Sequence, residues 1–141
     1  FISRYGNPAT DYDNAHVRGW FRHGATVVSV SGGVDVSNVD RVSEYAKRFI
    51  LADKPFVLDL SAVDTFAPQA FKLLSAIDDQ CLTVGVEWAM VPGDAVSRQL
   101  RARSDEALLP LVSSVAEAER EFDGAVMRRR RMMLPLLGNT A

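Results

Sequence analysis

Few residues of this chain have the types and spacing needed for acid–base or nucleophilic chemistry. The two histidines, His16 and His23, could act as general bases beside a serine and an aspartate. A serine nucleophile of that kind often sits in a strained strand-to-helix turn, and the sequence shows no such turn. Both histidines fall in a predicted opening hairpin and are interpreted as exposed hairpin residues, so no histidine-based active site is expected.

Three further features could suggest chemistry, and each has a simpler interpretation. Asp78 and Asp79 could form an acidic pair, but adjacent helix positions point about 100° apart and do not face each other. Cys81, the only cysteine, is interpreted as a small buried hydrophobe rather than a redox sensor. Gly32-Gly33 lacks the spacing of a dinucleotide fingerprint, and no phosphate-binding loop occurs. The sequence predicts a protein that is not an enzyme and uses no metal or cofactor.

Composition is typical of one globular domain. The chain has 141 residues, of which 48% are hydrophobic and 24% charged. Its net charge is −2, and Arg128–Arg131 contribute +4, so the remainder sums to −2 − 4 = −6. An acidic body argues against direct nucleic-acid binding. No apolar run approaches the roughly 20 residues of a membrane helix, and a lone cysteine suits a reducing compartment, so a cytoplasmic protein is expected.

The first part of the chain predicts an arm and a hairpin. Residues 1–14 are rich in Gly, Asn, Pro and Asp and predict a loop-like arm. Strands over 15–21 and 25–31 are expected to pair around Gly24. Their inward residues are expected to be Val17, Phe21, Val28 and Val30.

A helix and a buried strand follow. Ser37 is placed to cap the helix, with Asp40 three residues later. An apolar stripe then recurs at helical spacing, namely Val39, Val42, Tyr45 or Ala46, Phe49 and Ile50. The apolar run 56–60 predicts a strand covered on both faces, and residues 61–67 predict a loop.

The second half of the chain alternates helices with strands. Pro68 is well suited to the first position of a helix, whose stripe is Phe71, Leu74, Ile77 and Cys81. Gly85 ends that helix before a strand over 86–91. A short helix from Asp94 places Val96 and Leu100 inward, and 110–112 is a candidate edge strand. Ser114 then caps a last helix whose inward residues are Val115, Ala118 and Phe122.

This order predicts an α/β fold with a mixed, mostly parallel sheet of about five strands, about four helices and an opening β-hairpin. We divide the chain into an arm (1–14), a domain (15–123) and a basic and apolar tail (124–141). The tail, with Arg128–Arg131, could contact an acidic partner, membrane lipid or an RNA polymerase component. The favoured interpretation is a frayed helix end whose arginine stems cover apolar surface.

Three segments carry a resemblance to a known family. Residues 29–35 (SVSGGVD) resemble a strand that ends in Gly-x-x-Asp, 56–63 (FVLDLSAV) resemble a central strand, and 113–118 (SSVAEA) resemble the entry to a last helix. In this order and spacing they are similar to the STAS domains of bacterial anti-sigma factor antagonists. The resemblance covers about residues 15–122. It implies a non-enzymatic module that binds an anti-sigma factor or a related regulatory protein.

In that family the second helix typically begins with Asp-Ser-Ser/Thr-Gly-Leu, whose serine is phosphorylated by the partner. The matching positions here are 67–71, and the acceptor position holds Gln69, which has no hydroxyl. Conventional serine phosphoswitching is therefore not expected, and Gln69 would leave the surface in its unmodified state. The resemblance implies a partner-binding surface made of Gly33, Asp35, Ser37, Ala67, Pro68, Gln69 and Phe71.

Two hydroxyls are alternative candidates for phosphorylation. Thr65 lies just before the second helix, and Thr10 lies in the predicted arm. For Thr65 a loop residue bonded to its own backbone is the favoured interpretation, because that is ordinary turn chemistry. For Thr10 the favoured interpretation is a threonine without special purpose in a polar arm.

Two other functions remain open at this point. One is a scaffold that self-associates, as a homodimer or in a stress-signalling complex, through the hairpin edge or the tail. The other is a site for a small anion or lipid at the helix that begins with Pro68. The second ranks last, because the sequence has no basic residue between Asp64 and Phe71.

Overall fold

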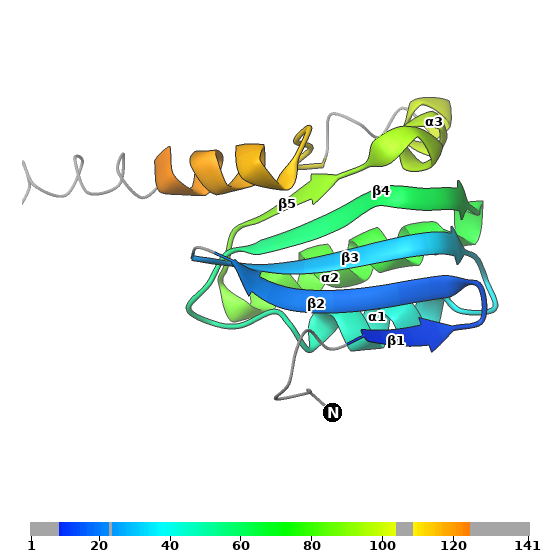
Figure 1. The fold of residues 1–141 in the computed structure, drawn as a ribbon, viewed down its shortest axis with the longest axis horizontal. Helices are drawn as coiled ribbons and strands as arrows, with labels where there is room; N and C mark the ends of the chain where they lie inside the picture. The colour runs from blue at the N-terminus through cyan, green and yellow to red at the C-terminus, as the bar shows by residue number, and fades with distance from the viewer. Residues whose placement is uncertain (1–8, 23, 104–108, 125–141) are drawn as a thin grey trace, which may run out of the picture.

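A five-stranded sheet forms the centre of the fold. The computed structural model describes residues 9–22, 24–103 and 109–124. The strands are β1 (Ala9–Tyr12), β2 (Ala15–Arg22), β3 (Ala25–Val34), β4 (Phe56–Phe66) and β5 (Trp88–Val91). They lie in the order β1-β2-β3-β4-β5 (Figure 1). The first three pair antiparallel, whereas β3–β4 and β4–β5 are parallel. The expected α/β fold with a mixed sheet is confirmed.

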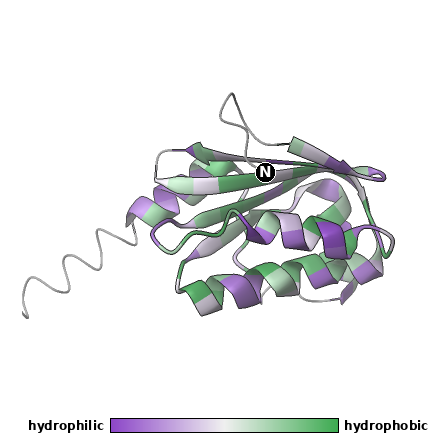
Figure 2. Cartoon of the chain, turned by 90° about the horizontal axis from the view of Figure 1, so that it is seen from below, coloured by the Kyte–Doolittle hydropathy of each residue, from purple (hydrophilic) through white to green (hydrophobic). Residues whose placement is uncertain are grey.

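Four helical segments accompany the sheet in the described part of the chain. They are α1 (Val39–Lys47), α2 (Phe71–Val84) with the 3-10 turn η1 (Pro68–Ala70) directly before it, α3 (Gly93–Arg103) and a helix over residues 115–124. α1 and α2 lie side by side against the sheet (Figure 1). Hydrophilic and hydrophobic residues alternate around the helices (Figure 2), as expected for helices that rest one side on a sheet.

Both faces of the sheet bury apolar side chains, because successive residues of a strand point to opposite faces. On β3, Val28 and Val30 belong to the larger core, which α1, α2 and α3 share. Ala25 and Val27 belong to a smaller core, which includes Ala118 and Phe122 of the helix over residues 115–124. The sheet is therefore covered by helices on both sides.

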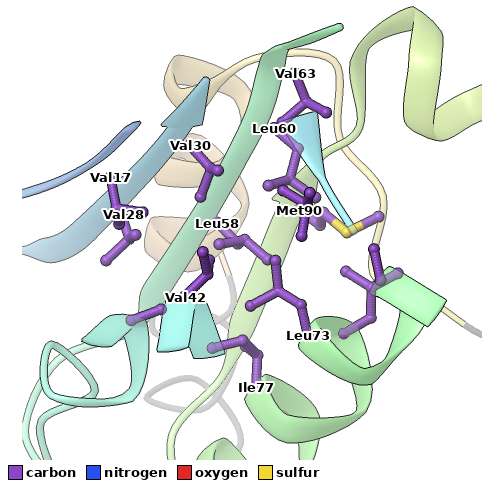
Figure 3. Packing of buried hydrophobic residues seen from close by; sticks show 14 of the residues in the cluster. Val17, Val28, Val30, Val42, Leu58, Leu60, Val63, Leu73, Ile77 and Met90 are labelled. Carbon is purple, nitrogen blue, oxygen red and sulfur yellow. The ribbon is translucent and has the colours of Figure 1, made fainter. Parts of the chain in front are cut away.

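The larger core is built from the stripes that the sequence predicts, with one correction in α2: Phe71 is only half-buried, whereas Leu73, which was not on the predicted stripe, is fully buried. Figure 3 shows Leu58 of β4 pointing toward Val42 of α1 and toward Leu73 and Ile77 of α2. All four side chains are fully buried. Full burial of such a side chain is worth roughly 1.5–3 kcal/mol, so this contact holds both helices on the sheet. The predicted inward residues of α1 and α3 are buried as well, namely Val39, Val42, Tyr45, Ala46, Val96 and Leu100.

Three predicted helix ends are confirmed. Pro68 is the first residue of η1, which runs directly into α2. Gly85 ends α2 in the left-handed region, with φ of 84°. The Ser114 hydroxyl caps the last helix by accepting a hydrogen bond of 3.0 Å from the amide of Glu117.

Two segments that the sequence predicts as irregular are strands. Residues 9–12, placed in the arm, form β1 and pair with β2. Residues 61–66, placed in a loop, continue β4 alongside β3. The β3–β4 register shifts between Ser29 and Ser31 and between Gly32 and Gly33. These irregularities break the alternation of buried and exposed residues along β4. The spacing of the apolar residues Val63 and Phe66 is therefore not typical of a strand.

Two details at the sheet margins also differ from prediction. Phe21 is 55% exposed instead of buried, because the core on its side of β2 ends at Gly19, against which the Phe49 ring packs. The predicted edge strand over 110–112 is reduced to a single parallel bridge between Leu111 and Met90.

Candidate functional site

The ends of β3 and β4 bring together two loops that are far apart in the sequence. The two strands are parallel, and their register pairs Val34 with Phe66 at their last residues. The amide of Ala67 donates a 3.0 Å hydrogen bond to the carbonyl of Val34. The arrowheads of β3 and β4 accordingly lie at the same end of the sheet (Figure 1). The loop that begins with Asp35 and the start of α2 are therefore neighbours, as the resemblance implies.

The loop after β3 is organised around the carboxylate of Asp35. Its Oδ1 accepts hydrogen bonds from the amide of Ser37 at 2.9 Å and from the Ser37 hydroxyl at 2.5 Å. The hydroxyl first, and then the amide, hold the pKa of Asp35 below its ordinary value. This corrects the prediction for Ser37, which does not cap α1. The helix begins at Val39 after Asn38, and no side chain caps it.

Asn38, which the sequence analysis missed, ties this loop to the sheet. Its buried side chain accepts a hydrogen bond from the amide of Asp35 at 2.9 Å. Its amide nitrogen donates to the carbonyl of Gly33 at 2.9 Å and to that of Tyr12 at 3.1 Å. A single asparagine therefore links β1, β3 and the Asp35 loop. No local sequence pattern predicts this role of Asn38, because one of its hydrogen bonds is made to Tyr12 of β1, which is distant in the sequence.

The turn η1, directly before α2, presents an uncharged surface. Pro68 and Gln69 are exposed, whereas Ala70 is fully buried. The ring of Phe71 is half-buried and packs edge-on against Phe66, with ring centroids 5.6 Å apart. No side chain caps η1, because the preceding residue is Ala67. Gln69 thus lies in η1 with its side chain open to solvent.

Cavities flank this helix start on two sides. One, of about 420 Å³, lies between the strand ends and α3; its lining includes Asp35, Asp64, Thr65, Ala67, Arg98 and Gln99. The other, of about 600 Å³, lies between α1 and α2; its lining includes Asp40, Glu44, Lys47, Gln69, Lys72 and Asp79. The surface is therefore hollowed and bears charges of both signs.

Several residues of this surface were not anticipated. Arg98 and Gln99 of α3 line the smaller cavity, and the guanidinium of Arg103 lies 4.1 Å from the centre of the Phe71 ring. Arg98, Gln99 and Arg103 lie at this surface because α3 packs on β4, a contact that no spacing in the sequence predicts. Val36, between Asp35 and Ser37, is 67% exposed. Basic side chains of α3 thus join Lys72 of α2 near the helix start.

The residues considered for catalysis are dispersed. His16 bonds to Asp11 across β1 and β2, where both side chains are largely exposed. Asp78 accepts a 3.0 Å hydrogen bond from the indole of Trp88 instead of pairing with Asp79. Within residues 9–22, 24–103 and 109–124 no group of three or more His, Cys, Asp or Glu could hold a metal ion. His23 lies outside the described residues.

Cys81 of α2 is buried in the larger core. Burial, with a smaller contribution from Asp78, raises the pKa of its thiol to about 12. Since the thiolate is the reactive form, the raised pKa and the burial both disfavour reaction of this thiol in the folded protein. The tail that includes Arg128–Arg131 lies outside the described residues.

A family model named the STAS domain matches residues 21–118. The chain belongs to the STAS domain family. A relative from Mycobacterium tuberculosis, Osmosensory protein A, is 40% identical over 143 residues, which cover 99% of this chain and 90% of the relative. The crystal structure of an anti-sigma factor antagonist from Mycobacterium paratuberculosis shares the STAS fold, with a TM-score of 0.63 at 20% identity. That similarity covers 86% of this chain and 97% of the other.

Helices long and apolar enough to cross a membrane are absent from the described segments of this STAS domain. Gln69 is exposed in η1, directly before α2. Thr10 lies on β1, paired opposite Val17, and Thr65 lies on β4, paired opposite Gly33. Thr65 lines the cavity of about 420 Å³ together with Asp35.

Proposed function

We propose that this STAS domain is a non-enzymatic regulatory module that binds an anti-sigma factor and thereby antagonises it. The docking surface comprises the residues at the ends of β3 and β4 and at the start of α2, namely Gly33, Asp35, Ser37, Ala67, Pro68, Gln69 and Phe71. The observation that carries the proposal is the register that pairs Val34 with Phe66. It holds a carboxylate with a lowered pKa beside an uncharged, exposed helix start.

Each part of the docking surface has a role that its chemistry supports. Asp35 is fixed by Ser37 and accepts hydrogen bonds from a basic group of the partner. Gln69 offers both a donor and an acceptor without a charge that would need to be desolvated. Val36 and Pro68 add exposed apolar contact next to these polar groups.

The docking surface is not switched at the family's usual position. Phosphorylation of a hydroxyl there would add roughly −1.5 to −2 charges at the interface. Gln69 has no hydroxyl and cannot accept a phosphate. ATP and a kinase are therefore expected to leave the mass of Gln69 unchanged.

The relatives support a place in stress-regulated transcription. The 40% identical relative is named an osmosensory protein, and a structural neighbour is an anti-sigma factor antagonist. We place this STAS domain in the cytoplasm, where sigma factors act, as a regulator of a response to osmotic stress.

Capture of partners from an extract of the native host tests the proposal. The full chain and an Asp35→Ala variant serve as baits, and eluted proteins are identified by mass spectrometry. An Asp53→Ala variant is the matched control, because Asp53 is exposed in the loop before β4, at the opposite end of that strand. The wild type and the control should retain an anti-sigma factor that Asp35→Ala loses. A wild-type bait that retains none, yet forms a dimer in light scattering, would favour the scaffold function.

A further inference from the structure

The end of the sheet opposite the docking surface carries aromatic rings beside cations. β2 ends there and β3 begins there, and Phe21 is 55% exposed while Trp20 is half-buried. Successive strand residues point to opposite faces, so this end is aromatic on both faces of β2. The Lys54 ammonium lies 5.7 Å from the centre of the Phe21 ring. The Arg18 guanidinium lies 5.2 Å from the centre of the Trp20 ring. We call these four residues, Arg18, Trp20, Phe21 and Lys54, the hairpin patch.

The last described helix brings the chain to the same end of the molecule. Glu119, in the helix over residues 115–124, accepts a 2.9 Å hydrogen bond from Arg22, the last residue of β2. Phe122, one turn later, shares the smaller core with Ala25, the first residue of β3. Figure 1 shows the hairpin and the end of this helix at one end of the molecule. The chain therefore continues beyond residue 124 from a point next to the hairpin.

The sequence that continues from this end joins a basic cluster to an apolar run. Arg128–Arg131 are followed directly by MMLPLL over 132–137. The described residues here carry both signs, since Arg22 pairs with Glu119 and Lys54 follows Asp53, so the four arginines supply a positive excess. An acidic protein or a nucleic acid would match the arginines but would leave the apolar run and Phe21 in water. The surface of an anionic bilayer matches both, because it offers phosphates above acyl chains.

We propose that the hairpin patch and the segment over 125–137 together bind the surface of an anionic lipid bilayer. The arginines pair with lipid phosphates, while Phe21 and the apolar run enter the boundary between headgroups and acyl chains. Lys54 and Arg18 keep their charged ends at the level of the phosphates. β3 and β4 begin at this end and finish at the docking surface, so a bilayer bound here leaves Asp35 and Gln69 accessible. The inference goes beyond the proposed function and does not depend on it.

Co-sedimentation of the purified full chain with lipid vesicles tests this inference. The vesicles contain phosphatidylcholine alone, or phosphatidylcholine with about 30% of the anionic lipid phosphatidylglycerol. The chain should sediment with the anionic vesicles and stay in solution with the neutral ones, and added salt should weaken the binding. Trp88 is 9% exposed and Trp20 is half-buried, so a blue shift of the tryptophan emission on binding would report on the hairpin patch.

Matched substitutions at the two ends of the sheet locate the contact. Phe21→Ser should weaken binding to anionic vesicles about fivefold or more, whereas Val36→Ser, exposed at the opposite end, should bind vesicles like the wild type. Lys54→Gln should weaken binding about fivefold, whereas Lys72→Gln in α2 should not. Glutamine at all four positions of Arg128–Arg131 should weaken it about a hundredfold or more. Circular dichroism shows whether the variants are folded.

Three results would overturn the inference. The first is a wild-type chain that stays in solution with the anionic vesicles. The second is equal vesicle binding by Phe21→Ser and Val36→Ser, which would remove the hairpin patch from the contact. The third is binding of a single-stranded RNA probe without binding of vesicles, which would make a nucleic acid the ligand of the arginines. Capture of an anti-sigma factor is a separate measurement, so its failure counts against the proposed function alone.

Discussion

The carboxylate of Asp35 accepts two hydrogen bonds from Ser37, one from its amide at 2.9 Å and one from its hydroxyl at 2.5 Å. Both bonds reach the same oxygen, Oδ1, and the other oxygen makes no hydrogen bond among the described residues. Ser37 thus orients the carboxylate and leaves one oxygen for a partner. Preorganisation of this kind lowers the cost of binding, since the group is ordered before the partner arrives.

Ser37→Ala is expected to raise the pKa of Asp35 toward its ordinary value, because the hydroxyl bond is the largest cause of the depression. A carboxyl whose pKa is lowered by folding stabilises the fold above its unfolded pKa of about 3.9. That contribution disappears as the pH falls through the folded pKa. Titration of the Asp35 carboxyl carbon by NMR, in wild type and variant, measures the shift. The same titration curve in both proteins would show that Ser37 does not hold the carboxylate.

Gly19→Ala should destabilise the fold by about 1–3 kcal/mol through overpacking. An added Cβ would lie 2.6 Å from the nearest ring carbon of Phe49, which is buried. In a Phe49→Leu background the smaller side chain makes room, so the same change should cost less. Urea unfolding of the four proteins of this double-mutant cycle gives the coupling. Equal costs in both backgrounds would contradict the contact.

Thr26→Val should stabilise the fold by about 1 kcal/mol, because a buried hydroxyl without a partner is replaced by a methyl group of similar size. The Thr26 side chain is fully buried, and its Oγ1 has no hydrogen bond within the described structure. Thr26→Ser keeps the hydroxyl, loses the methyl group and should destabilise. Thermal unfolding of both variants tests the pair. A less stable Thr26→Val would mean that the hydroxyl has a partner after all.

Cys81 should resist alkylation in the folded protein. Burial raises the pKa of its thiol to about 12, so almost no thiolate forms at neutral pH. The rate of iodoacetamide labelling at pH 8 should be far lower in buffer than in denaturing urea, as followed by intact-mass spectrometry. Fast labelling of the folded chain would reopen a redox role for this residue.

Local chemistry made much of this fold predictable. The apolar stripe of α1, the proline at the start of η1, the glycine after α2 and the Ser114 cap each depend on a few neighbouring residues. These four features are predictable from the sequence because helix stripes and caps have short, fixed residue spacings. The placement of the Asp35 loop beside Ala67 was implied by the STAS resemblance, and the backbone hydrogen bond between Ala67 and Val34 agrees with it.

The remaining features depend on contacts between distant segments. The end of β4 was predicted as a loop because irregularities in the β3–β4 register break its alternation. The role of Asn38 requires β1, which the polar composition of residues 9–12 concealed. Arg98 reaches the cavity only because α3 packs on β4. No residue spacing in the sequence predicts these contacts between distant segments.

The affinity of the captured partner for Gln69→Glu tests the docking surface most directly. A carboxylate at this exposed position loses both donors of the amide and adds a charge, so binding should weaken about tenfold or more, or roughly 1.4 kcal/mol. Gln80→Glu makes the same chemical change on the same helix, about 16 Å along its axis, and serves as the control. Isothermal calorimetry with purified proteins should find weaker binding for Gln69→Glu and unchanged binding for Gln80→Glu. Equal affinity of wild type and Gln69→Glu would contradict the account.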